Sequence, residues 1–180
     1  MSKIYKIVIV GPVGAGKTQA VKVLSDIEVV STEATASDSV GAVKAETTVA
    51  MDYGVLNLPG GDRVRLYGTP GQERFDFMWE ILSENALGVV LLLDGGAPDP
   101  VADLRAYVAA FRRIIDESTL VVGITHSSWG DRHVRPVVAA ELTRLGLPAT
   151  VMNVDARERA EMVTLVKTLI YSLDPMHEAS

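Results

Sequence analysis

The sequence contains no cysteine, and only 6% of its 180 residues are aromatic. Without cysteine the chain forms no disulfide and offers no site for prenylation or palmitoylation. It also has no apolar run of the roughly 18 residues that a membrane-spanning helix needs. The apolar start MSKIYKIVIV lacks a small-residue cleavage site and leads directly into a glycine-rich segment. We therefore expect a cytoplasmic protein with no lipid anchor.

Positive charge is also scarce: 17 Lys and Arg stand against 23 Asp and Glu, for a net charge of −6. This balance disfavours nucleic acid or an anionic membrane surface as a partner. Hydrophobic residues make up 48% of the chain, enough for a full core. With no internal repeat, low-complexity tract or linker, the length predicts a single domain over residues 1–180.

The most informative segment is GPVGAGKT, residues 11–18, which directly follows the apolar run Ile4–Val10. It fits the phosphate-binding pattern G-x-x-x-x-G-K-[ST] in the strand-then-helix context that the pattern requires. Its glycines allow backbone N–H groups to surround phosphate, and the following helix adds its positive end. We expect Lys17 to reach the β- and γ-phosphates and the Thr18 hydroxyl to bind Mg²⁺. The candidate phosphate-site residues are Gly11, Val13, Gly14, Ala15, Gly16, Lys17 and Thr18.

Apolar runs alternate with segments of helical period along the rest of the chain, which predicts βα units and a mostly parallel sheet. The expected strands are Lys3–Val10, Thr48–Leu58, Asp62–Tyr67, Gly88–Leu93, Thr119–Thr125 and Ala149–Val154. The expected helices are Lys17–Ser25, Phe75–Asn85, Asp99–Asp116, Pro136–Arg144 and Arg157–Leu173, with a long loop over Asp26–Glu46. A hairpin turn at Pro59-Gly60-Gly61 joins the second and third strands. The predicted fold class is α/β, with three layers and a six-stranded, mostly parallel sheet that has one antiparallel edge strand.

Two further segments carry a family resemblance. YGTPGQERF, residues 67–75, resembles the switch II sequence of Ras-like small GTPases, and TVAMDY, residues 48–53, resembles their switch I. The proline before Gly71 and the long segment ahead of switch I are similar to the bacterial Ras-like GTPases of the MglA type, which act in polarity and gliding motility. The resemblance covers nearly the whole chain. It implies the P-loop NTPase fold of a Ras-like G domain, with GTP or GDP and Mg²⁺ as cofactors.

By this resemblance, Thr48 joins Thr18 as a metal ligand and also meets the γ-phosphate. The N–H of Gly71 would contact the γ-phosphate, and Gln72 would be the catalytic residue that orients the attacking water. As alternatives, Thr48 is a plain strand former and Gln72 a solvated loop residue. Val13 occupies a position where Ras-like enzymes often have glycine. A β-branched side chain there would crowd Gln72 or an incoming arginine, so we expect slow hydrolysis of GTP.

The chain departs from the family pattern at two positions. Gly68 stands where most Ras-like proteins have an aspartate that holds Mg²⁺ through water, so we expect the metal to rely on Thr18, Thr48 and phosphate oxygens. Ser128 stands where the family's base-recognition aspartate accepts two hydrogen bonds from guanine. The first departure predicts weak metal binding in the diphosphate state, and the second predicts a reduced preference for guanine.

The remaining base-site candidates lie at the ends of the last two strands. Thr125, His126 and Ser128 occupy the position of the base-recognition motif, and His126 either stacks on a purine or is an ordinary surface histidine. Asp155-Ala156-Arg157 resembles the loop whose backbone N–H contacts guanine O6, although Asp155 also suits the N-cap of the last helix.

These residues favour a GTP-binding molecular switch that hydrolyses GTP slowly. The alternative is a degenerate or nucleotide-locked P-loop interaction module, with weak base specificity and little turnover. A P-loop kinase or metabolic ATPase ranks third, since no arginine-rich lid is evident. The resemblance implies a roadblock-type GTPase-activating protein as regulator, together with an effector.

Overall fold

The computed structural model describes residues 1–36, 47–69, 84–127 and 133–173. Its strands are β1 (Ile4–Val10), β2 (Val30–Ala36), β3 (Thr47–Asn57), β4 (Arg63–Gly68), β5 (Gly88–Asp94), β6 (Leu120–Thr125) and β7 (Thr150–Asn153). Its helices are α1 (Lys17–Leu24), α3 (Pro100–Glu117), α4 (Val134–Arg144) and α5 (Arg159–Tyr171). The helix expected over Phe75–Asn85 lies almost wholly outside the described residues.

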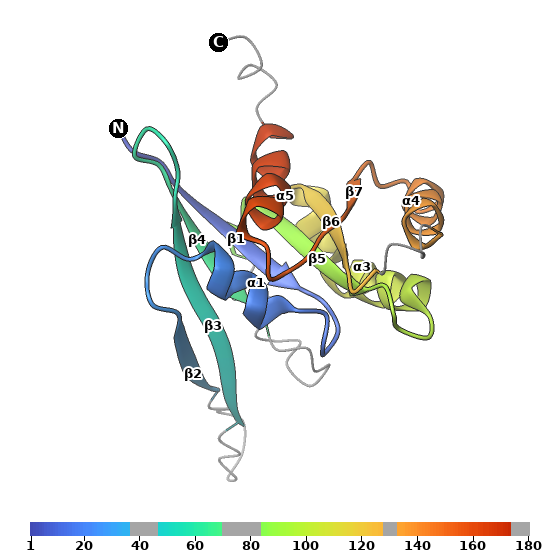
Figure 1. Ribbon diagram of the computed structural model, residues 1–180, viewed down its shortest axis with the longest axis horizontal. Coiled ribbons are helices and arrows are strands. Elements are labelled where there is room, and N and C mark those ends of the chain that lie inside the picture. Colours follow the sequence, from blue (N-terminus) through green and yellow to red (C-terminus); the bar gives the residue numbers. More distant parts are fainter. Residues whose placement is uncertain (37–46, 70–83, 128–132, 174–180) are drawn as a thin grey trace.

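The strands form one sheet of seven in the order β2-β3-β4-β1-β5-β6-β7. Neighbours from β4 to β7 pair in parallel, whereas β3 is antiparallel to both β2 and β4. Figure 1 shows helices on both faces of this sheet. The predicted class is confirmed: an α/β fold of the P-loop NTPase type, with three layers and its antiparallel part at one edge. The predicted number of six strands is wrong, because β2 adds a seventh strand outside the antiparallel β3.

The core has two halves because alternate residues of the central strands face opposite sides. Ile7 and Ile9 of β1 pack with residues of α1 and α5, such as Val21 and Leu165. Val8 and Val10 pack with residues of α3 and α4 on the other side. A strand that is covered on both faces needs apolar residues at nearly every position, which explains the composition of β1 and β5.

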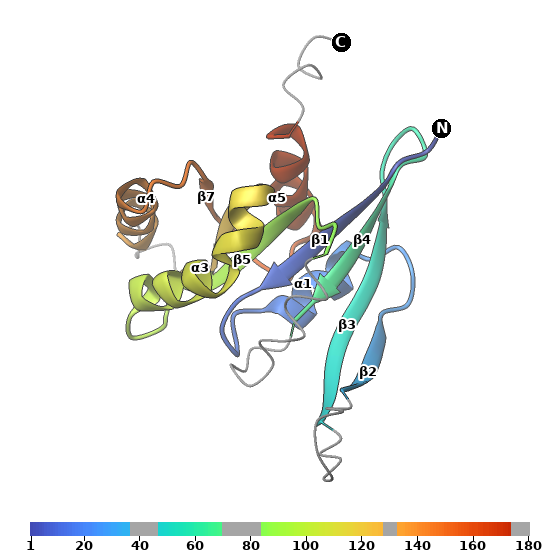
Figure 2. The same cartoon turned by 180° about the vertical axis from the view of Figure 1, so that it is seen from behind.

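Strand β2 was not expected, since residues 26–46 were predicted to be a loop. Its backbone pairs with β3 from Val30 opposite Tyr53 to Ala36 opposite Thr47. Figures 1 and 2 both show β2 and the adjoining half of β3 extending beyond the rest of the sheet. The segment VSTEATA contains the β-branched residues that suit a strand, but its pairing depends on a partner elsewhere in the chain.

Helix boundaries follow local capping signals where these exist. Asp99 caps α3 by accepting a hydrogen bond from the backbone N–H of Ala102, as its sequence position suggests. The last helix begins at Arg159, with Glu158 as its N-cap residue, so the expected start at Arg157 and the capping role of Asp155 are wrong. No helix in the described part of the chain is long and apolar enough to cross a membrane.

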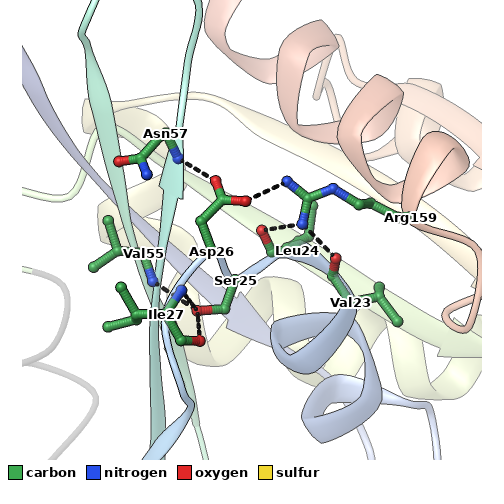
Figure 3. A network of polar contacts seen from close by, with 8 residues as sticks. All are labelled: Val23, Leu24, Ser25, Asp26, Ile27, Val55, Asn57 and Arg159. Atoms are coloured by element: carbon green, nitrogen blue, oxygen red, sulfur yellow. Dashed lines mark hydrogen bonds and ion pairs between the residues drawn. The ribbon is translucent and has the colours of Figure 1, made fainter.

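The turn after α1 joins that helix to both β3 and α5 (Figure 3). Asp26 accepts hydrogen bonds from the backbone N–H of Asn57 at 2.7 Å and from the Arg159 guanidinium at 2.7 Å. Arg159 also donates to the carbonyl groups of Val23 and Leu24, which end α1. We call Ser25, Asp26 and Arg159 the anchor cluster.

Candidate functional site

The glycine-rich segment of residues 11–18, called the P-loop below, begins at the carboxyl end of β1, in the middle of the sheet. The carboxyl ends of β4, β5, β6 and β7 lie at the same edge because these strands are parallel to β1. Strand β3 is antiparallel, so it brings its first half to that edge, with Asp52 opposite Gly68. Ligands in such sheets bind outside the carboxyl ends, where connections leave in opposite directions.

Glycine is required at two points of the loop. A Cβ at Gly11 would lie 2.1 Å from the carbonyl oxygen of Leu92 in β5, so any other residue would clash with backbone. Gly16 adopts φ 97° as the N-cap of α1, a left-handed conformation that side chains disfavour. The loop can therefore pass close to β5 and turn directly into the helix.

Lys17 is folded over the loop that precedes it. Its Nζ donates to the carbonyl groups of Gly11 at 2.6 Å and Pro12 at 2.8 Å, and its side chain is buried. Burial lowers the pKa of Lys17 to about 8, opposed by the carboxylate of Asp52. A buried ammonium of this kind gains from a nearby anion, so the residue suits a phosphate group.

Thr18 contacts an acidic side chain, that of Asp52, which was not predicted as a site residue. Its Oγ1 donates to Asp52 Oδ2 at 2.6 Å, and Ser31 of β2 donates to Asp52 Oδ1 at 3.1 Å. The expectation that the metal relies on Thr18, Thr48 and phosphate oxygens did not include this carboxylate. Hydroxyl and carboxylate oxygens are the ligand types that Mg²⁺ prefers, so these residues fit the ion.

The end of β6 supports the P-loop from its other side. The buried Thr125 donates from Oγ1 to the carbonyl oxygen of Ala15 at 2.8 Å, and His126 Nε2 lies 3.1 Å from that of Gly14. His126 has a positive φ of 54°, which turns the chain at this point. A Cβ at Gly16 would lie 3.0 Å from Cβ of Ala156, so the loop after β7 also touches the P-loop. These predicted residues therefore meet around one loop.

Asp155 and Arg157 form an ion pair beside this contact. The Asp155 carboxylate accepts from the backbone N–H of Arg157 at 2.9 Å and from its guanidinium at 3.0 and 2.8 Å. The side-chain and backbone hydrogen bonds from Arg157 lower the pKa of Asp155 to about 2. This carboxylate is therefore ionised at neutral pH and holds Arg157 next to Ala156.

Other predicted positions are described only in part or not at all. Gly71, Gln72 and Ser128 lie outside the described residues. The backbone of Thr48 is in β3, paired with Thr35, four positions before Asp52. Val13 is exposed. The roles assigned to these residues remain predictions.

A signal for Asp52 was present in the sequence. The turn at Pro59-Gly60-Gly61 closes the β3–β4 hairpin, and the pairing starts with Asn57 opposite Arg63. Counting five residues outward on both strands places Asp52 opposite Gly68. The hairpin register therefore predicts that Asp52 lies beside Gly68, the position where most Ras-like proteins have an aspartate.

Comparisons with known proteins give two partial similarities. An uncharacterized protein of Methanocaldococcus jannaschii is 31% identical over 90 residues, which are 49% of this chain and 50% of that protein. The chain thus spans about half the length of this relative. The intraflagellar transport protein 22 homolog of Danio rerio is 24% identical over 152 residues, which are 79% of this chain and 76% of that protein. No family model matches the chain.

Proposed function

We propose that this protein is a guanine-nucleotide-binding switch of the small GTPase type, similar to the bacterial MglA-type GTPases. The observation that carries the proposal is the P-loop between β1 and α1, with the buried Lys17 at its helix end. Thr125, His126 and Ala156 pack against the other side of the loop, where a base would lie next to bound phosphates. The similarity to the Danio rerio protein over most of the chain adds support.

In this proposal, backbone N–H groups of residues 11–16 and the N-terminus of α1 hold the phosphates. Lys17 leaves the carbonyl groups of its own loop for the β- and γ-oxygens, and the Thr18 hydroxyl would hold Mg²⁺, which would neutralise charge on the phosphates. Thr48 and Gly71 respond to the γ-phosphate, and Gln72 orients the attacking water. Loss of the γ-phosphate then changes how this face meets an effector, with a roadblock-type protein as the regulator.

The base is recognised by weaker contacts than in a protein with an aspartate at position 128. The backbone N–H of Ala156 pairs with guanine O6 and rejects the amine of adenine. A lost charged hydrogen bond reduces discrimination by about 1.5–3 kcal/mol, or roughly ten- to a hundredfold. Guanine is therefore preferred by a small margin.

The test is nucleotide analysis of protein purified without added ligand, followed by titration with GDP, GTP, ADP and ATP in Mg²⁺. We expect guanine nucleotides to bind more tightly, and Ser128→Asp to widen the margin. Equal affinity for ATP and GTP, or weaker GTP binding by Ser128→Asp, would contradict the placement of the base site.

The second candidate is a nucleotide-locked interaction module, which the replacements at Gly68 and Ser128 favour. The two candidates differ in turnover. A switch releases phosphate from bound GTP and changes between diphosphate and triphosphate states, whereas a locked module does neither. Single-turnover phosphate release from the preloaded GTP complex distinguishes them.

A further inference from the structure

We infer that Glu161, in the first turn of α5, is a positioning residue for recognition of the base. Its carboxylate holds the backbone of Asp155, so that the N–H of the next residue, Ala156, stays directed at the base. The inference rests on the proposed nucleotide function. It goes beyond that function because Glu161 acts through Asp155 and not by contact with the nucleotide, and yet sets how well guanine O6 is distinguished from the amine of adenine.

The backbone N–H groups of residues 154–158 supply the first observation. Four of these five groups donate hydrogen bonds at 2.7 to 3.0 Å, and their acceptors are the carbonyl oxygen of Ile124, Oε2 of Glu161, Oδ1 of Asp155 and the carbonyl oxygen of Asp155. The fifth N–H, that of Ala156, has no acceptor within the described part of the chain, although the residue is only 6% exposed. A backbone N–H in such a place favours a ligand that offers an oxygen acceptor.

The second observation is the orientation of the peptide group between Asp155 and Ala156. Its carbonyl oxygen accepts from the N–H of Glu158, the N-cap residue of α5, at 2.9 Å. In a trans peptide the C=O and N–H bonds point in opposite directions, so the Ala156 N–H points away from the start of α5. Ala156 itself lies against the P-loop, because a Cβ at Gly16 would lie 3.0 Å from its Cβ. This orientation suits a contact with the proposed base.

The third observation is the hydrogen bond on the other side of Asp155. Its N–H donates to Glu161 Oε2 at 2.7 Å. Glu161 is the third residue of α5, and a carboxylate is favourable near the positive end of a helix. A hydrogen bond to a carboxylate is also stronger than one between neutral groups. Because the peptide groups on both sides of the Asp155 Cα are bound, the direction of the Ala156 N–H is fixed.

Helix α5 is itself fixed against α1, the helix that follows the P-loop. The guanidinium of Arg159, two residues before Glu161, donates to the carbonyl groups of Val23 and Leu24 at 2.9 and 3.1 Å (Figure 3). The start of α5 therefore cannot turn without breaking these contacts. Glu161 thus holds residues 155–157 in a set position relative to α1, as supporting groups do for residues that bind a ligand.

The experiment compares three diphosphates that differ in the base: GDP, inosine diphosphate (IDP) and ADP. GDP and IDP both have O6, whereas ADP carries an amine in its place. Isothermal titration in Mg²⁺ gives the three affinities for the parent and for Glu161→Ala. One neutral hydrogen bond changes affinity by roughly two- to tenfold. Glu161→Ala should therefore weaken binding of GDP and IDP by about fivefold and leave ADP within about twofold of the parent.

Two variants serve as controls, and a third repeats the loss. Glu161→Gln keeps an oxygen acceptor in the same place and should bind all three nucleotides as the parent does. Glu158→Ala removes a carboxylate from the same exposed end of α5, one that makes no capping hydrogen bond, and should also bind as the parent does. Glu161→Ser has a side chain too short to reach Asp155 and should repeat the pattern of Glu161→Ala. It gives the same test should Glu161→Ala not fold.

An equal loss of affinity for GDP, IDP and ADP would overturn the inference, because Glu161 would then contribute to stability alone. Unchanged GDP and IDP affinities in the variants that lose the acceptor would overturn it as well. Failure of the proposed function is distinct, since it appears in the parent: the parent would bind none of the three nucleotides, or bind ADP as tightly as GDP.

Discussion

The two halves of β3 are held in different ways. In the first half, the backbone pairs with the edge strand β2, and Asp52 is bound through side-chain hydroxyl groups, those of Thr18 and Ser31. In the second half, the backbone is bound: Val55 donates to Ser25 Oγ, Val55 accepts from the N–H of Asp26, and Asn57 donates to the Asp26 carboxylate. Arg159 then joins Asp26 to α5 at 2.7 Å (Figure 3).

The difference indicates which half of β3 can move at the smaller cost in free energy. Hydroxyl contacts to Asp52 can be exchanged for contacts to a metal ion or to water, and the first half of β3 can move together with β2, its ladder partner at the edge of the sheet. The second half would have to lose backbone hydrogen bonds to β4 and to the turn after α1, together with the ion pair between Asp26 and Arg159. We therefore expect nucleotide-dependent change to affect the first half of β3 and to stop at the anchor cluster.

The largest expected effect is that of Lys17→Ala, which removes the buried ammonium group near Asp52 and the first half of β3. Charged hydrogen bonds contribute about 1.5–3 kcal/mol each, so nucleotide affinity should fall at least a hundredfold, or roughly 2.7 kcal/mol. Isothermal titration with GDP and GTP measures this. Lys22→Ala, an exposed residue of the same helix, is the matched control and should bind as the parent does. Unchanged affinity in Lys17→Ala would exclude phosphate binding at this loop.

Asp26→Ala tests how strongly the anchor cluster holds the second half of β3. It removes one hydrogen bond to the β3 backbone and one ion pair, so the free energy of unfolding should fall by about 1–3 kcal/mol. Urea denaturation measures the loss, and release of nucleotide should stay near the parent value in Mg²⁺. Glu117→Ala breaks the exposed pair with Arg113 and should change stability by about 0.5 kcal/mol or less. Equal effects of both variants would remove the contrast between the two halves.

Hydrogen exchange should separate the halves directly. Backbone amides of residues 47–52 should differ by roughly tenfold in exchange rate between the GDP complex and a GTP-analogue complex, as a difference in opening of about 1.4 kcal/mol would give. Those of residues 53–57 should match within error. The same protection in both complexes along all of β3 would instead favour the nucleotide-locked module.

The smallest expected effect lies outside both halves. Hydrogen bonds from Arg144 and Arg105 lower the pKa of Glu141 from 4.5 to about 2. A carboxyl whose pKa is lower in the folded state adds stability above its unfolded pKa, and this is lost as the pH falls from 4.5 towards 2. Glu141→Gln should therefore lower the melting temperature slightly at pH 7 and flatten its acid dependence. Nucleotide binding should not change, and any change would link α4 to the site.

Local patterns were sufficient for much of the fold and for the centre of the site. The glycines of residues 11–16 and the lysine after them identify the P-loop, because backbone conformation and phosphate chemistry both depend on those residue types. Continuous apolar runs located β1, β5 and β6, because these strands are buried on both faces, and helical periodicity located α3, which buries one face. Segments without a strong period, such as residues 30–36, were read as loop.

Only the tertiary structure decided which residues far apart in the chain come into contact. Strand β2 exists because β3 supplies its hydrogen-bonding partners, and neither segment alone shows this. Asp52 reaches Thr18 across 34 residues, and Arg159 reaches Asp26 across 133. The local propensities of an aspartate and a threonine do not depend on which distant residue each contacts. Their pairing therefore follows from strand order and register rather than from the residues themselves.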